Sequence, residues 1–358
     1  MQWKIDCTEL KEEIKKHQLV TGANIINFDF KKDALYLYSY NGPTSIFSKL
    51  ADIKTAEPVQ FSAEMGFMVK LVNKFSDTVS LKFEEGGTLK YISNRSRGEI
   101  ICTPWEGQEN VLLENEQTLS SFMKDAIFDL TPKVNLDKKC YPENPGLQVQ
   151  MKNGKLRVMT SGARITAMAV KAMEELKEVD ESADFLLSYC MNLSKIFDKS
   201  EEIEIRTNIS TLQFSSEKRI VNLPLIKIIN AVTIDNMLNW ASTDGTNDKI
   251  KFSFNASCKE ILSTMEDFDI YLGDATGAFC IKGEKGKPVV MEASSSKGKM
   301  QKKMEVVSDQ DFTSYVIYTD LVSALKLSGE EINFRIFPNA VQIKNKDYIF
   351  TLNAYSEK

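Results

Sequence analysis

The chain has 358 residues, of which 42% are hydrophobic and 27% are charged. This composition is that of an ordinary soluble globular protein, and the length suits three domains of common size better than one. The formal net charge of −5 at pH 7 argues against an ordinary DNA-binding protein, which would be strongly basic. No apolar run approaches the roughly 20 residues that span a bilayer, and the N-terminus lacks the features of a signal peptide. We therefore expect a cytoplasmic protein without a membrane partner.

Few residues offer catalytic or metal-binding chemistry. The six cysteines are scattered without a CxxC pair and are predicted to be reduced core residues. The only histidine, His17, follows two lysines on a predicted helix and is expected to be exposed. Residues 283–288 lack the spacing of a phosphate-binding loop and are better interpreted as a hairpin tip. We therefore expect no enzymatic activity, no cofactor and no metal site.

The first third of the chain contains two predicted helices among alternating strands. Apolar residues at helical spacing predict helices over residues 8–18 and 66–75. Apolar residues at every second position predict strands. These strands are residues 2–6, 25–30, 34–40, 59–62, 79–83, 89–91 and 100–102.

The other two thirds follow the same plan. In the second third, helices are predicted over residues 116–130 and 186–197, with strands at 147–151, 156–159, 203–205, 212–214 and 221–223. In the last third, the predicted helices are residues 256–265 and 320–327. Its predicted strands are residues 251–254, 268–272, 278–282, 332–336, 341–343 and 348–352.

One unit, a short amphipathic helix followed by three strands, therefore occurs three times. Its first strand begins near Val79, Ile203 and Ile332, which are 124 and 129 positions apart. This regularity predicts three tandem copies of one α+β domain, each with two helices packed on antiparallel sheets. The polar segments near residues 105–110 and 242–248 are predicted linkers. We place the domains at residues 1–109, 110–247 and 248–358.

Three local segments, in this order and spacing, resemble the bacterial DNA polymerase III β subunit family, the DNA sliding clamps. Asn94-Arg-Ser-Arg-Gly-Glu-Ile-Ile-Cys-Thr-Pro resembles the family's Gly-Arg-Ser-Arg strand, which leads to Leu-Pro. Leu156-Arg-Val-Met-Thr-Ser-Gly-Ala-Arg-Ile resembles the family's Ala-Thr-Asp-Gly-His-Arg-Leu segment. Tyr348-Ile-Phe-Thr-Leu-Asn-Ala-Tyr stands where the family ends in Tyr-Val-Val-Met-Pro-Met-Arg. The chain departs from the family at Gly98, which replaces a large apolar residue, and at Ala163, which replaces histidine.

The resemblance implies a ring, formed as a head-to-tail homodimer that encircles duplex DNA without sequence specificity. Such a processivity factor tethers a DNA polymerase and other proteins that carry a clamp-binding motif, and it is placed on DNA by a clamp loader. An acidic exterior is natural for it, because strong contacts with DNA would stop sliding. The strand that contains Arg97 and Ile100 is the expected dimer interface.

Weak attraction to phosphates inside the ring would come from lysines on the predicted helices. The candidates are Lys11, Lys15, Lys16, Lys70, Lys74, Lys124, Lys195, Lys199, Lys259 and Lys326. Each of them can also be interpreted as an ordinary solvated helix lysine. The seven lysines within residues 282–303 are either part of a solvated loop or an added DNA contact at the rim of the ring.

The resemblance further implies a hydrophobic pocket for client peptides between the second and third domains. Its residues would be Thr160, Gly162, Ala163, Arg164, Ile165, Phe350, Leu352 and Asn353. Phe350 and Leu352 can equally be core residues of a strand. Two other functions stay open: a clamp-fold protein that binds or titrates clients without encircling DNA, and a hydrolase or transferase on an α+β scaffold.

Overall fold

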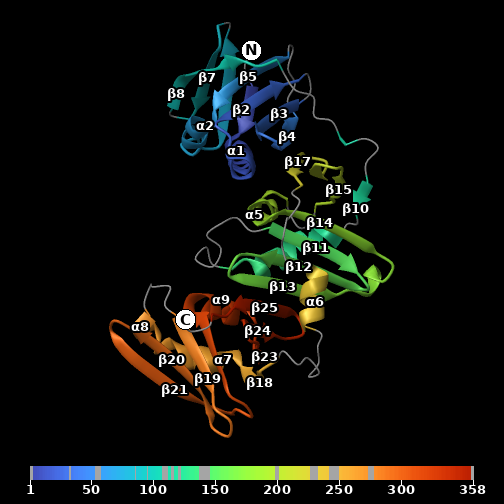
Figure 1. Ribbon diagram of the computed structural model, residues 1–358. Helices are drawn as coiled ribbons and strands as arrows, with labels where there is room; N and C mark the ends of the chain where they lie inside the picture. Colours follow the sequence, from blue (N-terminus) through green and yellow to red (C-terminus); the bar gives the residue numbers. More distant parts are fainter. Residues whose placement is uncertain are drawn as a thin grey trace. The chain divides into compact units, whose positions relative to one another are not determined.

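The computed structural model of the protein (Figure 1) describes residues 3–31, 34–52, 58–84, 86–94, 96–106, 112–113, 117–119, 122–136, 146–197, 201–225, 233–241, 250–272 and 278–355. Contacts divide the chain into two compact units. Unit 1 consists of Met1–Lys124 and Met191–Leu225, and unit 2 of Asp125–Cys190 and Ile226–Lys358. Among the described residues, no helix combines the length and the apolar character needed to cross a membrane.

Unit 1 is built on two antiparallel sheets. The four-stranded sheet has the order β1 (Trp3–Asp6), β6 (Thr78–Glu84), β7 (Thr88–Ser93), β8 (Ser96–Ile101). The nine-stranded sheet has the order β10 (Gln117–Leu119), β15 (Glu204–Thr207), β16 (Thr211–Ser215), β17 (Arg219–Pro224), β4 (Thr44–Asp52), β3 (Ala34–Asn41), β2 (Ile25–Phe30), β5 (Val59–Glu64), β9 (Thr103–Pro104). The helices α1 (Cys7–Thr21) and α2 (Met65–Val72) pack against each other and against these sheets.

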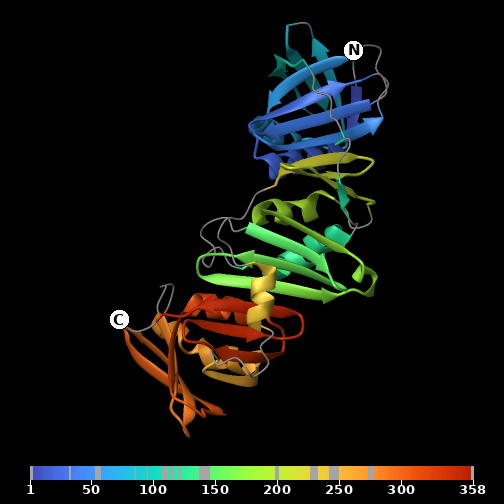
Figure 2. The same cartoon turned by 45° about the vertical axis from the view of Figure 1, so that its right-hand side comes forward.

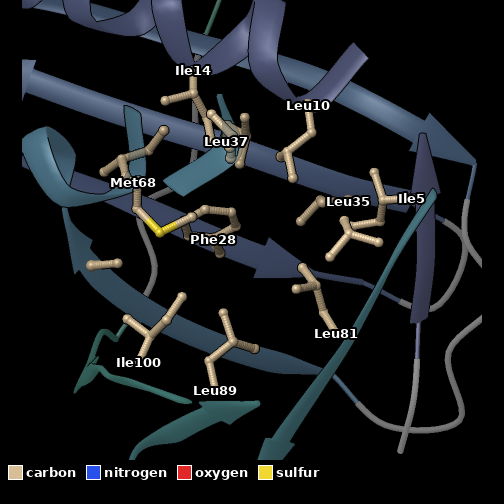
Figure 3. Close-up of a cluster of buried hydrophobic side chains, with 14 of the residues drawn as sticks. Ile5, Leu10, Ile14, Phe28, Leu35, Leu37, Met68, Leu81, Leu89 and Ile100 are labelled. Carbon is tan, nitrogen blue, oxygen red and sulfur yellow. The ribbon is translucent and has the colours of Figure 1, made fainter. Parts of the chain in front are cut away.

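The core of unit 1 lies between its sheets and these two helices. Figure 3 shows Leu10 and Ile14 of α1 above Phe28 and Leu37 of the nine-stranded sheet, while Leu89 comes from the four-stranded sheet. All five side chains are fully buried. Helix α1 begins at Asp6, whose carboxylate accepts hydrogen bonds from the first-turn amides, and ends at Gly22, whose φ of 56° suits glycine.

Unit 2 also has two antiparallel sheets. The eight-stranded sheet has the order β14 (Asp180–Leu186), β11 (Gly146–Lys152), β12 (Lys155–Ser161), β13 (Ile165–Ala172), β25 (Tyr348–Asn353), β24 (Ala340–Lys344), β23 (Glu331–Ile336), β18 (Phe252–Ser257). The four-stranded sheet has the order β21 (Gly298–Val307), β20 (Pro288–Ser295), β19 (Ala278–Gly283), β22 (Phe312–Ile317). The helices include α6 (Ile234–Ala241), α7 (Cys258–Glu266), α8 (Asp269–Leu272) and α9 (Tyr318–Leu327).

The repeated helix and three strands are present in all three thirds of the chain. Helix α2 is followed by β6, β7 and β8; helix α5 (Leu187–Ile196) by β15, β16 and β17; and helix α9 by β23, β24 and β25. Both large sheets contain strands from two neighbouring thirds, because β17 pairs with β4 and β25 pairs with β13. A sheet that continues across the predicted domain boundary explains why contacts group the chain into two units. The three-domain division stays a prediction.

Two secondary-structure predictions were wrong. Residues 117–119 form strand β10, and the predicted helix 116–130 begins only at Phe122, in α3 (Phe122–Asp125). It continues as a π-helical segment, Ala126–Leu130, and α4 (Thr131–Val134), where Pro132 removes a backbone donor. Residues 268–272 were predicted as a strand, but Asp269–Leu272 is helix α8. Phe268 and Leu272 are buried and four residues apart, a spacing that fits a helical face as well as alternation.

The prediction that His17 is exposed was also wrong, since its side chain is fully buried. Its ring nitrogens lie 3.0 Å from Ser39 Oγ and 2.8 Å from Ser48 Oγ, so both are satisfied by hydrogen bonds. Burial lowers the pKa of His17 to about 3, so the ring is neutral at pH 7. His17 follows Leu10 and Ile14 on the inward face of α1, and this periodicity outweighs the two preceding lysines.

Candidate functional site

The structure brings together the two segments that were predicted to form the client pocket. In unit 2, β13 pairs with β25 so that Ile165 lies opposite Leu352. The backbone amide of Asn353 donates to the Arg164 carbonyl at 2.9 Å, and the side-chain amide of Asn353 donates to the Ala163 carbonyl at 2.7 Å. Residues 160–165 and 350–353 are therefore neighbours, although almost two hundred positions separate them.

Several of these side chains are core residues rather than surface groups. Phe350 and Leu352 are 0% and 1% exposed, and Ile165 is 1% exposed. Thr160 is also buried, and its hydroxyl donates to the Val134 carbonyl at 3.2 Å. Among the predicted pocket residues, Ala163 and Asn353 are exposed, while Gly162 and Arg164 are half-buried.

The opposite face of the same strands carries an apolar cluster that the sequence analysis missed. Met159, Met168 and Ile349 pack there against Ile234 and Met237 of α6. Figures 1 and 2 show α6 lying over the sheet at β13 and β25. The hydroxyl of Thr351 lies 3.5 Å from the sulfur of Met237. The period-two spacing of Ile349 and Thr351 was the available signal for this cluster, because it places both residues on the face opposite to Phe350 and Leu352.

Arg164 is held by a buried acid. Its Nη2 atom lies 3.2 Å from Oδ1 of Asp320, at the start of α9. The Asp320 side chain is 2% exposed, whereas that of Arg164 is 20% exposed. The guanidinium therefore offsets the charge of a carboxylate that is almost fully buried.

The helix lysines proposed to face DNA are in varied environments. Lys16 pairs with Glu13 at 3.1 Å, and Lys124 Nζ donates to the Glu201 carbonyl at 2.6 Å. Lys11 is half-buried, and Lys199 lies outside the described residues. The exposed candidates are Lys15, Lys70, Lys74, Lys195, Lys259 and Lys326.

The lysine-rich stretch, residues 282–303, is mostly strand. Where a solvated loop was one interpretation of this stretch, the chain forms a tight hairpin, with only two residues between β20 and β21. Glu292 lies 3.5 Å from Lys282 Nζ and 2.9 Å from Lys299 Nζ, and Lys302 pairs with Asp267. Glu292, within the stretch, and Asp267, outside it, therefore offset part of the positive charge of the lysines.

The predicted interface strand, β8, lies at the edge of its sheet. Arg97 is exposed on this strand, whereas Ile100 is 5% exposed and belongs to the core in Figure 3. Gly98 faces the ring of Tyr91 on β7, and a Cβ atom at Gly98 would lie 2.6 Å from the Tyr91 hydroxyl. The Tyr91 ring, 5.2 Å from that of Phe75, thus occupies the space of the missing side chain.

Strands β8 and β21 are comparable edges of the two small sheets. In the described part of the chain, β8 pairs only with β7 and β21 only with β20. Large apolar side chains are exposed near both edges: Ile92 (55%) and Ile101 (89%) near β8, and Ile270 (71%) and Val307 (57%) near β21. Unpaired edges with exposed apolar residues are typical of interfaces.

Comparison with solved structures defines the fold. The chain superposes over its whole length on the DNA polymerase III β subunit of Thermotoga maritima, with a TM-score of 0.79 and 14% identity, covering 100% of both chains. It is similarly close to the sliding clamp of Bacillus subtilis (TM-score 0.78, 14% identity) and to the β subunit from the DNA polymerase of Streptococcus pyogenes (0.77, 15%), again covering 100% of both chains. No family model and no curated protein sequence matches the chain. The protein has the fold of the DNA sliding clamps.

Proposed function

We propose that this protein is a DNA sliding clamp, a noncatalytic processivity factor that encircles duplex DNA and tethers a DNA polymerase to it. The observation that carries the proposal is the agreement with solved clamps over the entire chain, at TM-scores of 0.77 to 0.79. Agreement over part of the chain would fit many proteins that reuse one clamp domain. Agreement over all three repeats fits a protein that needs all of them, as a ring around DNA would.

A homodimer would close the ring. In the described part of the chain, β8 is an edge strand of the small sheet of unit 1, and β21 is an edge strand of the small sheet of unit 2. Two copies that join these edges head to tail would leave neither edge exposed, which is the condition for a closed assembly. The three domains, residues 1–109, 110–247 and 248–358, would then appear twice around the hole.

DNA would be held by topology rather than by tight binding. The exposed helix lysines supply a few weak phosphate contacts, for which Lys15, Lys70 and Lys259 are examples. A net charge of −5 keeps the rest of the surface from binding DNA firmly. Both features favour movement along the duplex over arrest at one sequence.

Client proteins would bind in unit 2, next to the pairing of β13 with β25. Ala163 and Asn353 form the exposed part of this site, and Met159, Met168 and Met237 form an apolar layer beside it. These methionines are buried, so clients would meet Ala163 and Asn353 rather than this layer. A polymerase, a clamp loader and other DNA-processing proteins of the cytoplasm are the partners that this function requires.

The proposal is tested by mass and by retention on DNA. Light scattering at several concentrations should give twice the chain mass of 40.5 kDa. Protein loaded on nicked circular DNA should remain bound through a high-salt wash and should be lost when that DNA is linearised. A monomer at every concentration, or equal loss from circular and linear DNA, would contradict the proposal.

A further inference from the structure

A pocket of about 300 Å³ lies in unit 1, at the end of the nine-stranded sheet where α1 leads into β2. Its volume is at the lower end of the roughly 300–1,000 Å³ that is usual for ligand sites. The lining residues come from the turn after α1, from β2, β3 and β5, and from the segment after β9. None of these lining residues carries a charge, so the pocket suits an uncharged group.

Asn27 supplies a hydrogen-bond donor inside this pocket. Its side chain is 2% exposed, and its Oδ1 atom accepts a hydrogen bond from the Ser62 hydroxyl at 2.5 Å. Both residues line the pocket. In the described part of the chain, the Nδ2 atom of Asn27 has no hydrogen-bond partner. A ligand with a carbonyl oxygen would satisfy this donor, which is costly to leave unpaired when buried.

Large apolar side chains form the rest of the wall. Tyr40 and Ile25 are 54% and 52% exposed, and Trp105 is half-buried. The ring of Trp105 stacks on that of Tyr38, with the ring centroids 6.0 Å apart. Aromatic rings offer a large contact area and are enriched where proteins bind one another. The pocket therefore offers apolar contact and a hydrogen bond to the same ligand.

Unit 2 contains an equivalent position of its large sheet. Tyr38 and Met159 each lie four residues before the two-residue turn of a central hairpin, β3–β4 in unit 1 and β12–β13 in unit 2. Tyr38 lies opposite Asn27 on β2, and Met159 lies opposite Gln148 on β11. Asn27 and Gln148 are therefore equivalent amides of two repeats.

In unit 2, a segment of backbone already binds this amide. Ile234, at the start of α6, donates its backbone N–H to Oε1 of Gln148 at 3.3 Å and packs against Met159. In unit 1, the Trp105 ring supplies a similar apolar cover, but the amide nitrogen of Asn27 still lacks a partner among the described residues. The equivalent position thus indicates the kind of ligand, a peptide whose backbone meets the amide.

The charges at the rim of the pocket favour a basic partner. Glu64 lies opposite Ile25 at the end of β5, and Glu106 directly follows Trp105. Both carboxylates are exposed. They attract a lysine or arginine and repel the phosphates of a nucleic acid.

We propose that this pocket binds an extended peptide segment of a partner protein, whose uncharged apolar residue enters beside Tyr40 and Trp105. A lysine or arginine next to that residue meets Glu64 or Glu106, and a backbone carbonyl accepts a hydrogen bond from Asn27 Nδ2. The pocket lies in unit 1, whereas the client site lies in unit 2. The inference depends neither on ring closure nor on DNA binding, so it goes beyond the proposed function.

Selection of peptides tests the proposal. A phage-displayed library of short random peptides is panned on the full-length protein, and the selected peptides are compared for binding to the wild type and to Tyr40→Ala. Because Tyr40 is 54% exposed, its truncation leaves the core intact. Peptides that bind only the wild type should share an apolar residue next to a lysine or arginine. If every selected peptide binds both proteins equally, the proposal is overturned.

A selected peptide that carries a fluorophore then measures each contact by anisotropy. Tyr40→Ala should raise its Kd about tenfold or more, whereas Tyr355→Ala, which truncates a 49% exposed tyrosine of unit 2, should leave it unchanged. Asn27→Asp keeps an acceptor for Ser62 but loses the Nδ2 donor, so Kd should rise about tenfold. Urea unfolding shows whether this variant is folded. A folded Asn27→Asp protein with wild-type affinity would overturn the assigned hydrogen bond.

The rim charges are tested in the same assay. Glu64→Lys and Glu106→Lys should each raise the Kd of a basic peptide about threefold to tenfold at low salt. Glu12→Lys, the same change at an exposed position of α1, is the matched control and should have little effect. Equal weakening by all three changes would overturn the assignment of the basic residue. Binding of a labelled deoxythymidine oligonucleotide that is lost in Tyr40→Ala would overturn the peptide as the ligand.

Discussion

Arg219 on β17 binds Glu13 on α1 through two nitrogens, across 206 positions of sequence. Its Nε lies 3.1 Å from Glu13 Oε2, its Nη2 bonds Oε1, and its Nη1 lies 2.9 Å from Glu201. Both Arg219 and Glu13 are almost fully buried. Burial alone would raise the pKa of Glu13, but Arg219 outweighs burial and holds the pKa below its usual value. The contact joins strands from the second third of the chain to a helix from the first.

Removal of this arginine should therefore weaken unit 1 strongly. Arg219→Met removes the buried guanidinium from Glu13 and leaves only Lys16 beside it. This loss costs about 3–5 kcal/mol in the free energy of unfolding. Urea denaturation measures this change. Arg206→Met is the matched control, because Arg206 pairs with an exposed Glu204 and its loss costs about 1 kcal/mol or less. Equal effects of the two variants would contradict the prediction.

His17 should make stability depend on pH. Its pKa is lowered to about 3 in the folded protein, from an ordinary value of 6.5. The unfolded chain therefore binds a proton below pH 6.5 that the folded chain does not, so stability is complete above 6.5 and falls until about pH 3. The slope from this one group is at most about 1.4 kcal/mol per pH unit.

The measurement is urea unfolding of the wild type and of His17→Gln between pH 7 and pH 4. The variant lacks the titrating ring, so its stability should fall less over this range, even if it is lower at pH 7. Parallel curves for the two proteins would show that His17 does not take part. Glu13 adds a further loss of stability only as the pH falls through the ordinary value of 4.5, because its pKa in the folded protein lies below that value.

The Tyr91 ring should limit which side chains position 98 tolerates in place of Gly98. A side chain at Gly98 would approach the Tyr91 ring to within 3 Å, so Gly98→Val forces that ring to move. We expect a loss of about 1–3 kcal/mol in the free energy of unfolding. The same change in a Tyr91→Leu background should cost clearly less, because the shorter side chain leaves room. Thermal unfolding of the four proteins completes the cycle, and equal losses in both backgrounds would refute this packing explanation.

Local pattern predicted the repeated helices and strands because each has one face turned to a core. Leu10 and Ile14 follow the helical period, and Val79 and Leu81 follow the strand period, so these elements could be predicted without tertiary information. The contact of Arg219 with Glu13 could not be predicted in this way, because 206 positions separate the two residues and no local pattern relates them. Neither could the burial of His17, which depends on Ser39 and Ser48 of two other strands.

The pairing of the two candidate client segments was predicted, but the environment of their side chains was not. The resemblance to clamps placed residues 160–165 beside the last strand, and the structure has this pairing. It did not show which face of β25 turns toward the core, because Ile349, Phe350 and Leu352 are all apolar. Only the position of α6 over Ile349 distinguishes the two faces.

Helix lysines of unit 2 should change the affinity for DNA but should not be required for retention on circular DNA. Lys259 of α7 and Lys326 of α9 are exposed, and these two helices pack against each other. The double change Lys259→Gln and Lys326→Gln should weaken binding to linear duplex DNA at low salt. Each lysine that contacts a phosphate adds about 0.9 to the slope of log affinity against log salt, so the slope should fall by up to about 2.

Topological binding sets a limit to this effect, because a closed ring stays on circular DNA even when its contacts are weak. Retention of the double variant at high salt should therefore equal that of the wild type. Lys346→Gln, at an exposed turn that follows β24, is the matched control and should leave the salt slope unchanged. Complete loss of the double variant from circular DNA would mean that charge, rather than ring closure, holds the protein there.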